Sequence, residues 1–261
     1  MRFFGVPVAR SRDLGRGHAW TLHHVTLEDG RELFVKKGYD FSTEAHGLRW
    51  LGPPSAEVLD AEGDVLVLPW LPPEPPSEEA ARRLGRDLAA MHARGAPHFG
   101  AAWPGHIADL PLDNTPGEEW TSWYAERRVL PYLRMARDAD ALGPSDARAV
   151  EDALGRAHQP AEPPSRIHGD LWSGNVLYSG GRAHLVDPAA HGGHRETDLA
   201  MLALFGAPRL GDVLAAYTEV APMADGWRAR VPLHQLHPLL VHVVLFGGSY
   251  RTALLDAAAA I

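Results

Sequence analysis

One segment of this chain places two carboxylates and an amide at the spacing that phosphoryl transfer requires. Asp170 lies in the run His-Gly-Asp-Leu-Trp-Ser-Gly-Asn, and Asn175 follows it five residues later. In a kinase catalytic loop the carboxylate accepts the proton of the substrate hydroxyl, and the amide reaches a magnesium ion. Asp187 follows a predicted strand, turn and strand, where a second acid would hold Mg²⁺ against the nucleotide phosphates. We therefore predict a catalytic base at Asp170 and metal ligands at Asn175 and Asp187.

His168 and Trp172 stand beside Asp170 in the sequence, and neither is expected to be the catalytic base. A His-Gly-Asp triplet alone has little specificity and could be a surface loop, whereas the three groups in register are far more specific. His168 is expected to brace the loop, because a second base beside Asp170 would be redundant. Trp172 can stack on a sugar or pack in the core, and both roles remain open. Trp120 and Trp123 are expected on the core face of a helix.

A triphosphate also needs a cation, and the chain has only two lysines, Lys36 and Lys37. Lys36 ends the apolar run Leu-Phe-Val, as the phosphate-binding lysine does in the Val-Ala-Ile-Lys pattern of kinases, and Lys37 is its solvated neighbour. Glu44 lies on the following predicted helix and could hold Lys36 in an ion pair, with a solvated surface glutamate as the alternative. The downstream Asp187 favours the pair.

The glycines of the run Leu14 to His18 form the third candidate element for nucleotide binding. Gly15 and Gly17 precede the first long predicted strand and could let backbone N–H groups approach phosphates. As a Gly-x-Gly pattern this is weak, and an ordinary turn is the alternative. Only its position before Lys36 favours the phosphate role.

Fifteen histidines raise the question of a metal site. His191 with His194, or His234 with His237, could act as ligand pairs. No third ligand stands at the spacing of a tetrahedral site, so we expect packed or hydrogen-bonded histidines instead.

The first third of the chain has the pattern of strands with one helix. Residues 19–27 and 32–36 are predicted strands joined by an Asp-Gly turn, which makes a hairpin. Apolar spacing within 41–51 predicts a helix with Ser42 as its N-cap, and a Gly-Pro-Pro run ends it. Residues 65–68 form a further apolar strand.

A proline-dense stretch at 69–76 reads as a stiff linker, because proline cannot continue a helix or a sheet interior. We therefore expect a nucleotide-binding lobe at 1–68 and a catalytic and substrate lobe at 77–261. Helices are predicted from Ser77 onward and at 120–137, 145–158, 199–205, 213–220 and 233–246, with strands at 176–178 and 184–186.

Composition narrows the class of protein. The chain has 261 residues, 45% of them hydrophobic, with 33 acidic and 25 basic residues for a net charge of −8. This charge would repel nucleic acid, so we expect no such partner. Cysteine is absent, which excludes disulfides, thiolate zinc sites and cysteine nucleophiles. No apolar run suggests a signal peptide or a bilayer span, so a cytoplasmic protein is expected, and the scarcity of lysine is typical of a GC-rich bacterial genome.

The catalytic segment resembles that of the fructosamine kinases. The similar runs are 168–175, the Asp-Pro-Ala that begins at Asp187, and the Gly-His-Arg-Glu-Thr-Asp-Leu-Ala-Met of 193–201. Shorter runs agree in order and spacing, so the resemblance covers nearly the whole chain. They are 34–36, 44–48, 88–92, 99–100, 204–206 and 245–250.

The resemblance implies an α+β, two-lobed protein-kinase-like fold, with one helix beside a small antiparallel sheet in the N-lobe and a larger, mostly helical C-lobe. It also implies that ATP and Mg²⁺ are used to phosphorylate the third-carbon hydroxyl of ketosamines, the fructosamine, ribulosamine or erythrulosamine adducts of lysine and other amines. The phosphate is then a leaving group next to the ketone, so the adduct eliminates it and the amine is freed. The consequence is deglycation, by an enzyme that we expect to be a monomer.

By the same resemblance, Asp198 at a helix start would brace the catalytic loop. Three neighbouring residues, His194, Arg195 and Glu196, are assigned to the substrate. The ATP site is assigned to Lys36, Glu44, Gly15, Gly17, Leu68 and Trp70. The loop around Gly15 departs from the family, because Arg and His stand where small residues are usual and the preceding chain is short.

Two other functions are consistent with the motifs. An aminoglycoside or choline phosphotransferase shares the same three-residue skeleton, although Trp172 and the His194 segment favour a fructosamine kinase. A catalytically silent nucleotide-binding module is the second alternative. Because Asp170, Asn175, Asp187 and the phosphate lysine are all present, the silent module is the less favoured.

Overall fold

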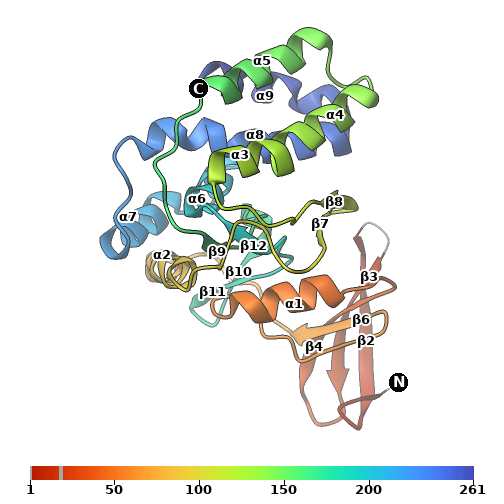
Figure 1. Cartoon of the computed structure of the whole chain (residues 1–261). Coiled ribbons are helices and arrows are strands. Elements are labelled where there is room, and N and C mark those ends of the chain that lie inside the picture. The colour runs from red at the N-terminus through yellow and green to blue at the C-terminus, as the bar shows by residue number, and fades with distance from the viewer. Residues whose placement is uncertain (1, 18–19) are drawn as a thin grey trace.

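The computed structural model describes residues 2–17 and 20–261, and its N-terminal part is a six-stranded antiparallel sheet (Figure 1). The strand order is β1-β2-β3-β4-β6-β5. His18 and Ala19, which the sequence analysis placed in the glycine loop and at a strand start, lie outside the described residues. The strands are β1 (Arg2–Phe3), β2 (Val6–Gly17), β3 (Trp20–Leu27), β4 (Glu32–Lys37), β5 (Asp60–Glu62) and β6 (Val65–Pro69).

The predicted hairpin is confirmed as β3 and β4, which pair with Val25 opposite Leu33. These two side chains and Val35 are buried together on one face of the sheet. Because side chains alternate along a strand, Lys36 points to the other face. That face carries helix α1 (Ser42–Leu51), whose Ala45 packs with the partly buried Phe34. The alternation of β4 therefore aims the lysine at the helix that carries Glu44.

The cap of α1 was predicted wrongly. Ser42 is the first residue of the helix, and Phe41 holds the N-cap position without a side-chain hydrogen bond. The Asp40 carboxylate instead accepts the backbone N–H of Ser42 at 2.9 Å. An acidic residue just before the helix supplies the acceptor that a capping serine would have offered.

The glycine pair lies within a strand that the sequence analysis missed. Gly15 and Gly17 are near the end of β2, opposite Leu22 and Trp20 of β3, after an irregularity between Asp13 and Gly15. The last residues of β2 are exposed on both faces, so no apolar alternation marked the strand.

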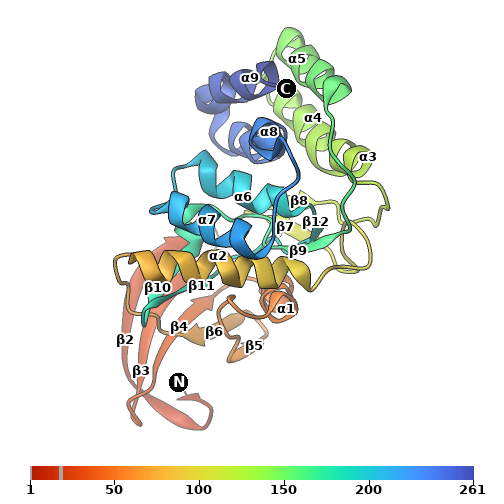
Figure 2. The ribbon, with the colours of Figure 1, turned by 90° about the vertical axis from the view of Figure 1, so that its left-hand side faces the viewer.

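The larger C-terminal part is mainly helical, so the fold is α+β and protein-kinase-like (Figures 1 and 2). Helix α2 (Glu78–Ala93) starts as predicted, with Ser77 Oγ accepting the Ala80 N–H at 3.1 Å. Figure 2 shows α2 crossing between the N-terminal sheet and α7. The other helices are α3 (Trp120–Tyr124), α4 (Leu130–Asp138), α5 (Pro144–Arg156), α6 (Arg195–Leu204), α7 (Leu210–Val220), α8 (Trp227–Phe246) and α9 (Arg251–Ala259).

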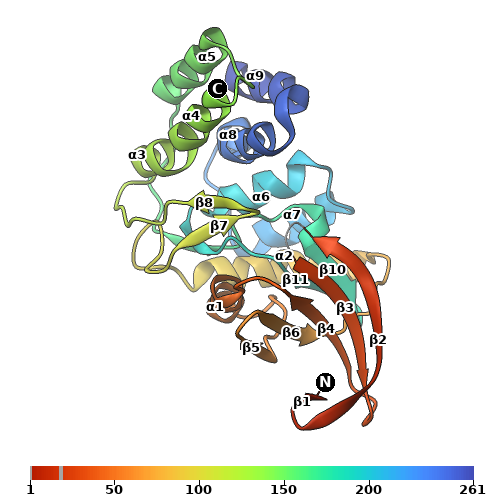
Figure 3. The same ribbon diagram turned by 90° about the vertical axis from the view of Figure 1, so that its right-hand side faces the viewer.

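Three two-stranded sheets accompany these helices. One is the predicted strand pair that leads to Asp187, and the other two were not predicted. In Figure 3 one of the unpredicted hairpins, β7–β8, lies above α1. The pairs are β7 (Gly105–Ile107) with β8 (Leu110–Leu112), β9 (Ser165–Ile167) with β12 (His191–Gly193), and β10 (Val176–Ser179) with β11 (Arg182–Leu185).

The two parts of the chain are joined by the linker and by bonds to α1 and the loop after it. Pro69, which the sequence analysis placed in the linker, is the last residue of β6 and pairs with Leu33, and the chain then runs without helix or strand from Trp70 to Ser77. In the loop after α1, Ala56 N–H donates to Leu185 O at 2.8 Å and Leu185 N–H donates to Pro54 O at 3.1 Å. The loop after α1 is thus bonded to the strand that leads to Asp187. At the end of α1, the carbonyls of Leu51 and Trp50 accept from Arg94 and Arg166.

Among the described residues, one helical stretch, Trp227–Ala259, is long and apolar enough to cross a membrane by length and composition alone. The sequence analysis expected no such run. This is weak support for a span, since the core helix of a globular protein passes the same test. Leu236, Leu240 and Val243 of α8 lie in the main core cluster with residues of α3, α4 and α5.

Candidate functional site

A cavity of about 230 Å³ lies where α1, the catalytic loop and the β7–β8 hairpin meet. The structure brings six of the predicted site residues to its wall, from segments as far apart as β4 and the end of β11. They are Lys36, Glu44, Asp170, Trp172, Asn175 and Asp187.

The catalytic loop is held from below by a buried carboxylate. Asp198 accepts the backbone N–H groups of His168 at 2.7 Å and Gly169 at 3.0 Å, and His92 Nε2 lies 3.1 Å away. Burial raises the pKa of Asp198, but the bonds and charges of His92 and His168 outweigh it, so the net pKa is lowered. His168 in turn bonds the Val186 carbonyl through Nε2 at 2.9 Å. His168 Nδ1 also accepts the Asp170 N–H at 3.3 Å, so both residues that we predicted to support the loop contact its backbone.

Asp170 lies beside Asn175, as their spacing predicted. Asn175 Nδ2 donates to the backbone oxygen of Asp170 at 2.8 Å and to its Oδ2 at 3.2 Å. Burial, together with the negative charge of Asp187, raises the pKa of Asp170 to about 7. A carboxylate with a pKa near neutrality suits a group that must accept a proton at physiological pH.

Lys36 joins the two remaining acids. Its Nζ donates to both oxygens of Glu44 at 2.9 Å and is also paired with Asp187. Burial lowers the pKa of Lys36, but Glu44 and Asp187 outweigh it, so the net pKa is raised and the ammonium is retained. Burial, together with the Asp187 charge, raises the pKa of Glu44 above its usual value, and the Lys36 ammonium opposes this shift. The ion-pair alternative for Glu44 is the one that the geometry favours.

Asp187 has an unusual backbone that fits a role in metal binding. Its φ of 54° lies in the left-handed region, which costs free energy for a residue with a side chain and is common at functional sites. Its side chain is 46% exposed, although Lys36 pairs with it. Asn175 uses its Nδ2 on Asp170, which leaves the amide oxygen as its acceptor. Carboxylate and amide oxygens are suitable Mg²⁺ ligands, so the residues present fit the metal.

Three predicted substrate residues are not brought to this cavity. His194 and Glu196 are buried, and Arg195 pairs with Glu162 at 2.7 Å. Glu196 accepts from Arg230 through both oxygens, at 3.0 and 2.6 Å. These side chains tie the start of α6 to neighbouring segments instead of facing Asp170.

The same region contains the third ligand that the sequence analysis did not find for a histidine metal site. His194, Glu196 and His234 offer atoms within 4.8 Å of one another. Both Glu196 oxygens are occupied by Arg230, and His194 Nδ1 accepts the Glu196 N–H at 3.2 Å. Burial raises the pKa of Glu196, but His234 and Arg230 outweigh it and lower the pKa to about 2. The arrangement is a closed ion-pair cluster.

Four other predicted ATP-site residues, Leu68, Trp70, Gly15 and Gly17, are not among the residues of the cavity wall. Leu68 is buried against the α1 side of the sheet, and Trp70 stacks on His24 with ring centroids 3.9 Å apart. Gly15 and Gly17 are on β2. Trp172, by contrast, is 41% exposed and lines the cavity, which favours a ligand contact over the core alternative.

Sequence reasoning missed part of the cavity wall. His106, Ile107 and Ala108 of the β7–β8 hairpin line it, together with Tyr39 and Phe41 before α1. The β7–β8 hairpin begins at the glycine of a Trp-Pro-Gly run and contains Pro111, and such residues are typical of a loop. Tyr39 and Phe41 stand within four residues of Lys37, and this closeness to the phosphate lysine could have indicated that they line the site.

The sequence matches the family model described as fructosamine kinase over residues 39–259. A crystal structure described as a candidate fructosamine-3-kinase from Thermobifida fusca is 54% identical, covers 98% of this chain and 94% of its own, and has a TM-score of 0.94. A candidate ketoamine kinase of Thermus thermophilus is 38% identical over 84% of this chain and 82% of its own length.

More distant proteins are similar as well. The chloroplastic protein-ribulosamine 3-kinase of Arabidopsis thaliana is 30% identical over 83% of this chain and 67% of its own length. An aminoglycoside phosphotransferase in complex with ADP and hygromycin B covers 97% of this chain and 94% of its own with a TM-score of 0.65. At 15% identity, that likeness concerns the fold alone.

Proposed function

Because this chain belongs to the fructosamine kinase family, we propose that it uses ATP to phosphorylate the 3-hydroxyl of ketosamines. The observation that carries the proposal is the meeting of Asp170, Asn175, Asp187 and Lys36 at one cavity. A base, two oxygen ligands and a cation at one wall are the groups that phosphoryl transfer to an alcohol requires.

The proposed steps follow from the positions of these side chains. Asp170 accepts the proton of the substrate 3-hydroxyl. At the same time the hydroxyl oxygen bonds to the γ-phosphorus of ATP, and the bond between that phosphorus and the ADP oxygen breaks. Asn175 and Asp187 would hold Mg²⁺, and its charge would offset that of the phosphates. Lys36, held by Glu44, leaves Asp187 and turns to the phosphates when nucleotide binds. Trp172 offers an aromatic face to the sugar.

The product explains why such an enzyme is useful. The third carbon is bonded to the ketone carbon, so loss of a proton from the first carbon gives an enaminol in which the phosphate is an allylic leaving group. Its departure expels inorganic phosphate and leaves an imine, which water hydrolyses to release the amine. The expected acceptors are free or protein-bound ketosamines, with no nucleic acid or membrane partner. We propose that the enzyme acts in the cytoplasm, where ATP is available, and that it is a monomer. Its proposed parts are a nucleotide-binding lobe at 1–68, a hinge at 69–76 and a catalytic lobe at 77–261.

A panel of acceptors tests the proposal. ATP consumption is measured with ribulose-lysine, erythrulose-lysine and fructose-lysine, beside kanamycin and choline. Turnover with at least one ketosamine and none with kanamycin or choline is expected. Turnover with kanamycin or choline alone would assign the chain to another branch of the same fold. Binding of Mg-ATP with no transfer to any acceptor would favour the silent module.

A further inference from the structure

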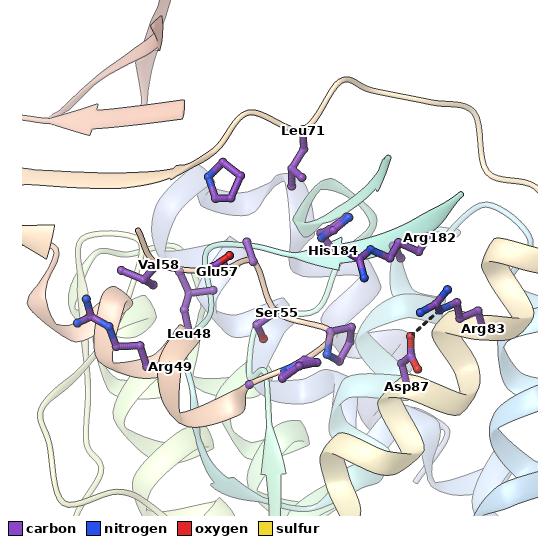
Figure 4. Close-up of a pocket in the computed structure, with 16 residues that line it drawn as sticks. Leu48, Arg49, Ser55, Glu57, Val58, Leu71, Arg83, Asp87, Arg182 and His184 are labelled. Carbon is purple, nitrogen blue, oxygen red and sulfur yellow. Dashed lines mark ion pairs between the residues drawn. The ribbon is translucent and has the colours of Figure 1, made fainter. Parts of the chain in front are cut away.

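A second cavity, of about 600 Å³, lies behind the linker, between the linker, the loop after α1 and α2 (Figure 4). Its wall comes from the end of α1, the loop after α1, the linker, α2 and β11, and it shares no residue with the catalytic cavity. The volume is within the range of small-molecule sites, roughly 300 to 1,000 Å³. It is therefore large enough for a ligand of its own.

Cationic side chains gather at one end of this cavity. Figure 4 shows Arg182 and His184 of β11 facing the Arg83–Asp87 pair of α2. Arg83 is only loosely paired, with its Nε 3.5 Å from Asp87, and both side chains are partly exposed. The side chain of Arg182 is exposed, and it has no ion pair or hydrogen bond with any residue that the structure describes. In a chain of net charge −8, a free guanidinium beside a second one forms an anion-binding end.

The opposite part of the cavity is apolar with mixed charge at its rim. Leu48 and Val58 lie there in Figure 4, and Pro53 and Leu71 are further apolar residues of the lining. Arg49 of α1 lies at this far end in Figure 4, and Glu57 is the remaining acid of the wall. The whole lining thus has three arginines against two carboxylates, with the unpaired positive charge concentrated beside His184. Such a wall fits a ligand with a flat apolar body and one anionic group.

Ser55 supplies an unused polar atom on the floor of the cavity. Its Oγ is shielded from solvent and has no hydrogen-bond partner among the described residues. An unpaired buried hydroxyl costs free energy that a ligand can recover. A rotation about χ1, which needs no backbone movement, would turn the hydroxyl towards the cavity.

The wall of this cavity is also part of the catalytic framework. Ser55 is bridged to Leu185, two residues before Asp187. The other end of the same loop continues from α1, which carries Glu44. A ligand that spans the loop, the linker and β11 would therefore hold Glu44 and Asp187 in one arrangement about Lys36.

From this geometry we propose that the cavity behind the linker binds a small organic anion, and that its occupancy is coupled to nucleotide binding in the catalytic cavity. The ligand class is an aromatic or similarly flat apolar body with one phosphate or carboxylate, whose charge lies between Arg182 and Arg83. The coupling rests on the proposed function, whereas the binding does not.

The test uses 1-naphthyl phosphate as the probe, with the full chain saturated with Mg-ADP so that the catalytic cavity is filled. Isothermal titration should show saturable binding, weakened about tenfold or more in Arg182→Gln, because a charge-assisted contact is lost. The control Arg86→Gln removes an exposed arginine of the same helix, α2, that does not line the cavity, and it should bind as the unaltered chain does. Both variants are on the surface and should fold.

Further arms separate the parts of the ligand. 1-Naphthol and inorganic phosphate should each bind more weakly than 1-naphthyl phosphate, and 1-naphthoate tells whether a carboxylate suffices. No saturable binding of 1-naphthyl phosphate or 1-naphthoate, or equal affinity in Arg182→Gln and the unaltered chain, would overturn the site.

The coupling has its own readout. Saturating probe should change the affinity for Mg-ADP by about fivefold or more, and this change should vanish in Arg182→Gln. An unchanged affinity, or a change that persists in the variant, would overturn the coupling. Failure of Mg-ADP to bind at all would contradict the proposed function and not the second site. In that case probe binding to the unaltered chain and to Arg182→Gln, both without nucleotide, would still test the site.

Discussion

The catalytic loop and the β2–β3 hairpin both belong to the predicted active site, but they are built in opposite ways. The loop from His168 to Asn175 is bonded through its backbone to the buried Asp198. The end of β2 around Gly15 is exposed and pairs with β3 on one side only. The difference teaches that the groups proposed to move a proton lie in a loop with bonded backbone, whereas the glycines predicted to approach the phosphates lie at the exposed end of a strand.

The largest expected effect comes from breaking the chemistry of the loop without loosening it. Asp170→Asn should lower turnover by about a thousandfold or more while Mg-ATP still binds, because the proton acceptor and one charge are removed. Single-turnover kinetics and thermal shift with Mg-ATP measure the two effects. Asp138→Asn, an exposed acid at the end of α4, is the control. Wild-type turnover in Asp170→Asn would reject Asp170 as the base.

Next in size is the loss of the brace beneath the loop. Asp198→Ala should reduce the free energy of unfolding by about 3 to 5 kcal/mol, since two backbone N–H groups and His92 lose a buried charged partner. Urea unfolding measures it. Because the pKa of Asp198 is lowered on folding, its contribution is present above the pKa of the unfolded carboxyl and is lost as the pH falls. Asp212→Ala, at an exposed ion pair, should change stability by less than about 1 kcal/mol. Equal losses in both variants would contradict the bracing role.

The acid limb of the pH profile should report Asp170. Its pKa is raised to about 7, so kcat/KM should be highest above that value and fall about tenfold per unit below it, as the base becomes protonated. Steady-state rates in the pH range of roughly 5 to 9 would show this. A profile that stays flat down to pH 5 would mean that no group with this pKa acts as the base.

The smallest effect on activity is expected from a substitution in the β2–β3 hairpin. Gly15 has a φ of +105°, so Gly15→Ala should destabilise the chain by about 1 kcal/mol and raise the KM for ATP a few-fold, with kcat almost unchanged. Gly211→Ala replaces a glycine of α7 that has open space and no positive φ, and it should be neutral or stabilising. A large loss of kcat in Gly15→Ala would show that the hairpin is as strictly positioned as the loop.

The parts of the site that could be predicted are those encoded by short spacing. Asp170 and Asn175 lie in one loop, and Asp187 follows a hairpin whose turn was readable. Ser77 was also a correct cap, because a capping side chain acts on residues next to it. Local chemistry was therefore sufficient for the base and for the expected metal ligands.

The parts that could not be predicted depend on partners far away in the sequence. Glu196 is buried because Arg230 pairs with it, and a charged residue after a glycine-rich run gives no sign of that. The polar end of β2 has no alternation of apolar side chains. Helix α8 contains Pro232 and Pro238, and its first turn was missed for this reason.

The pairing of the loop after α1 with Leu185 limits how the catalytic cavity can open. A sheet joined to the helices by the linker alone could take many orientations. Here the end of α1 is held as well, because Arg94 donates to the Leu51 carbonyl and Arg166 donates to the Trp50 carbonyl. A large movement of α1 would have to break these bonds together with those to Leu185, so α1 should keep its position relative to Asp187 through each catalytic cycle.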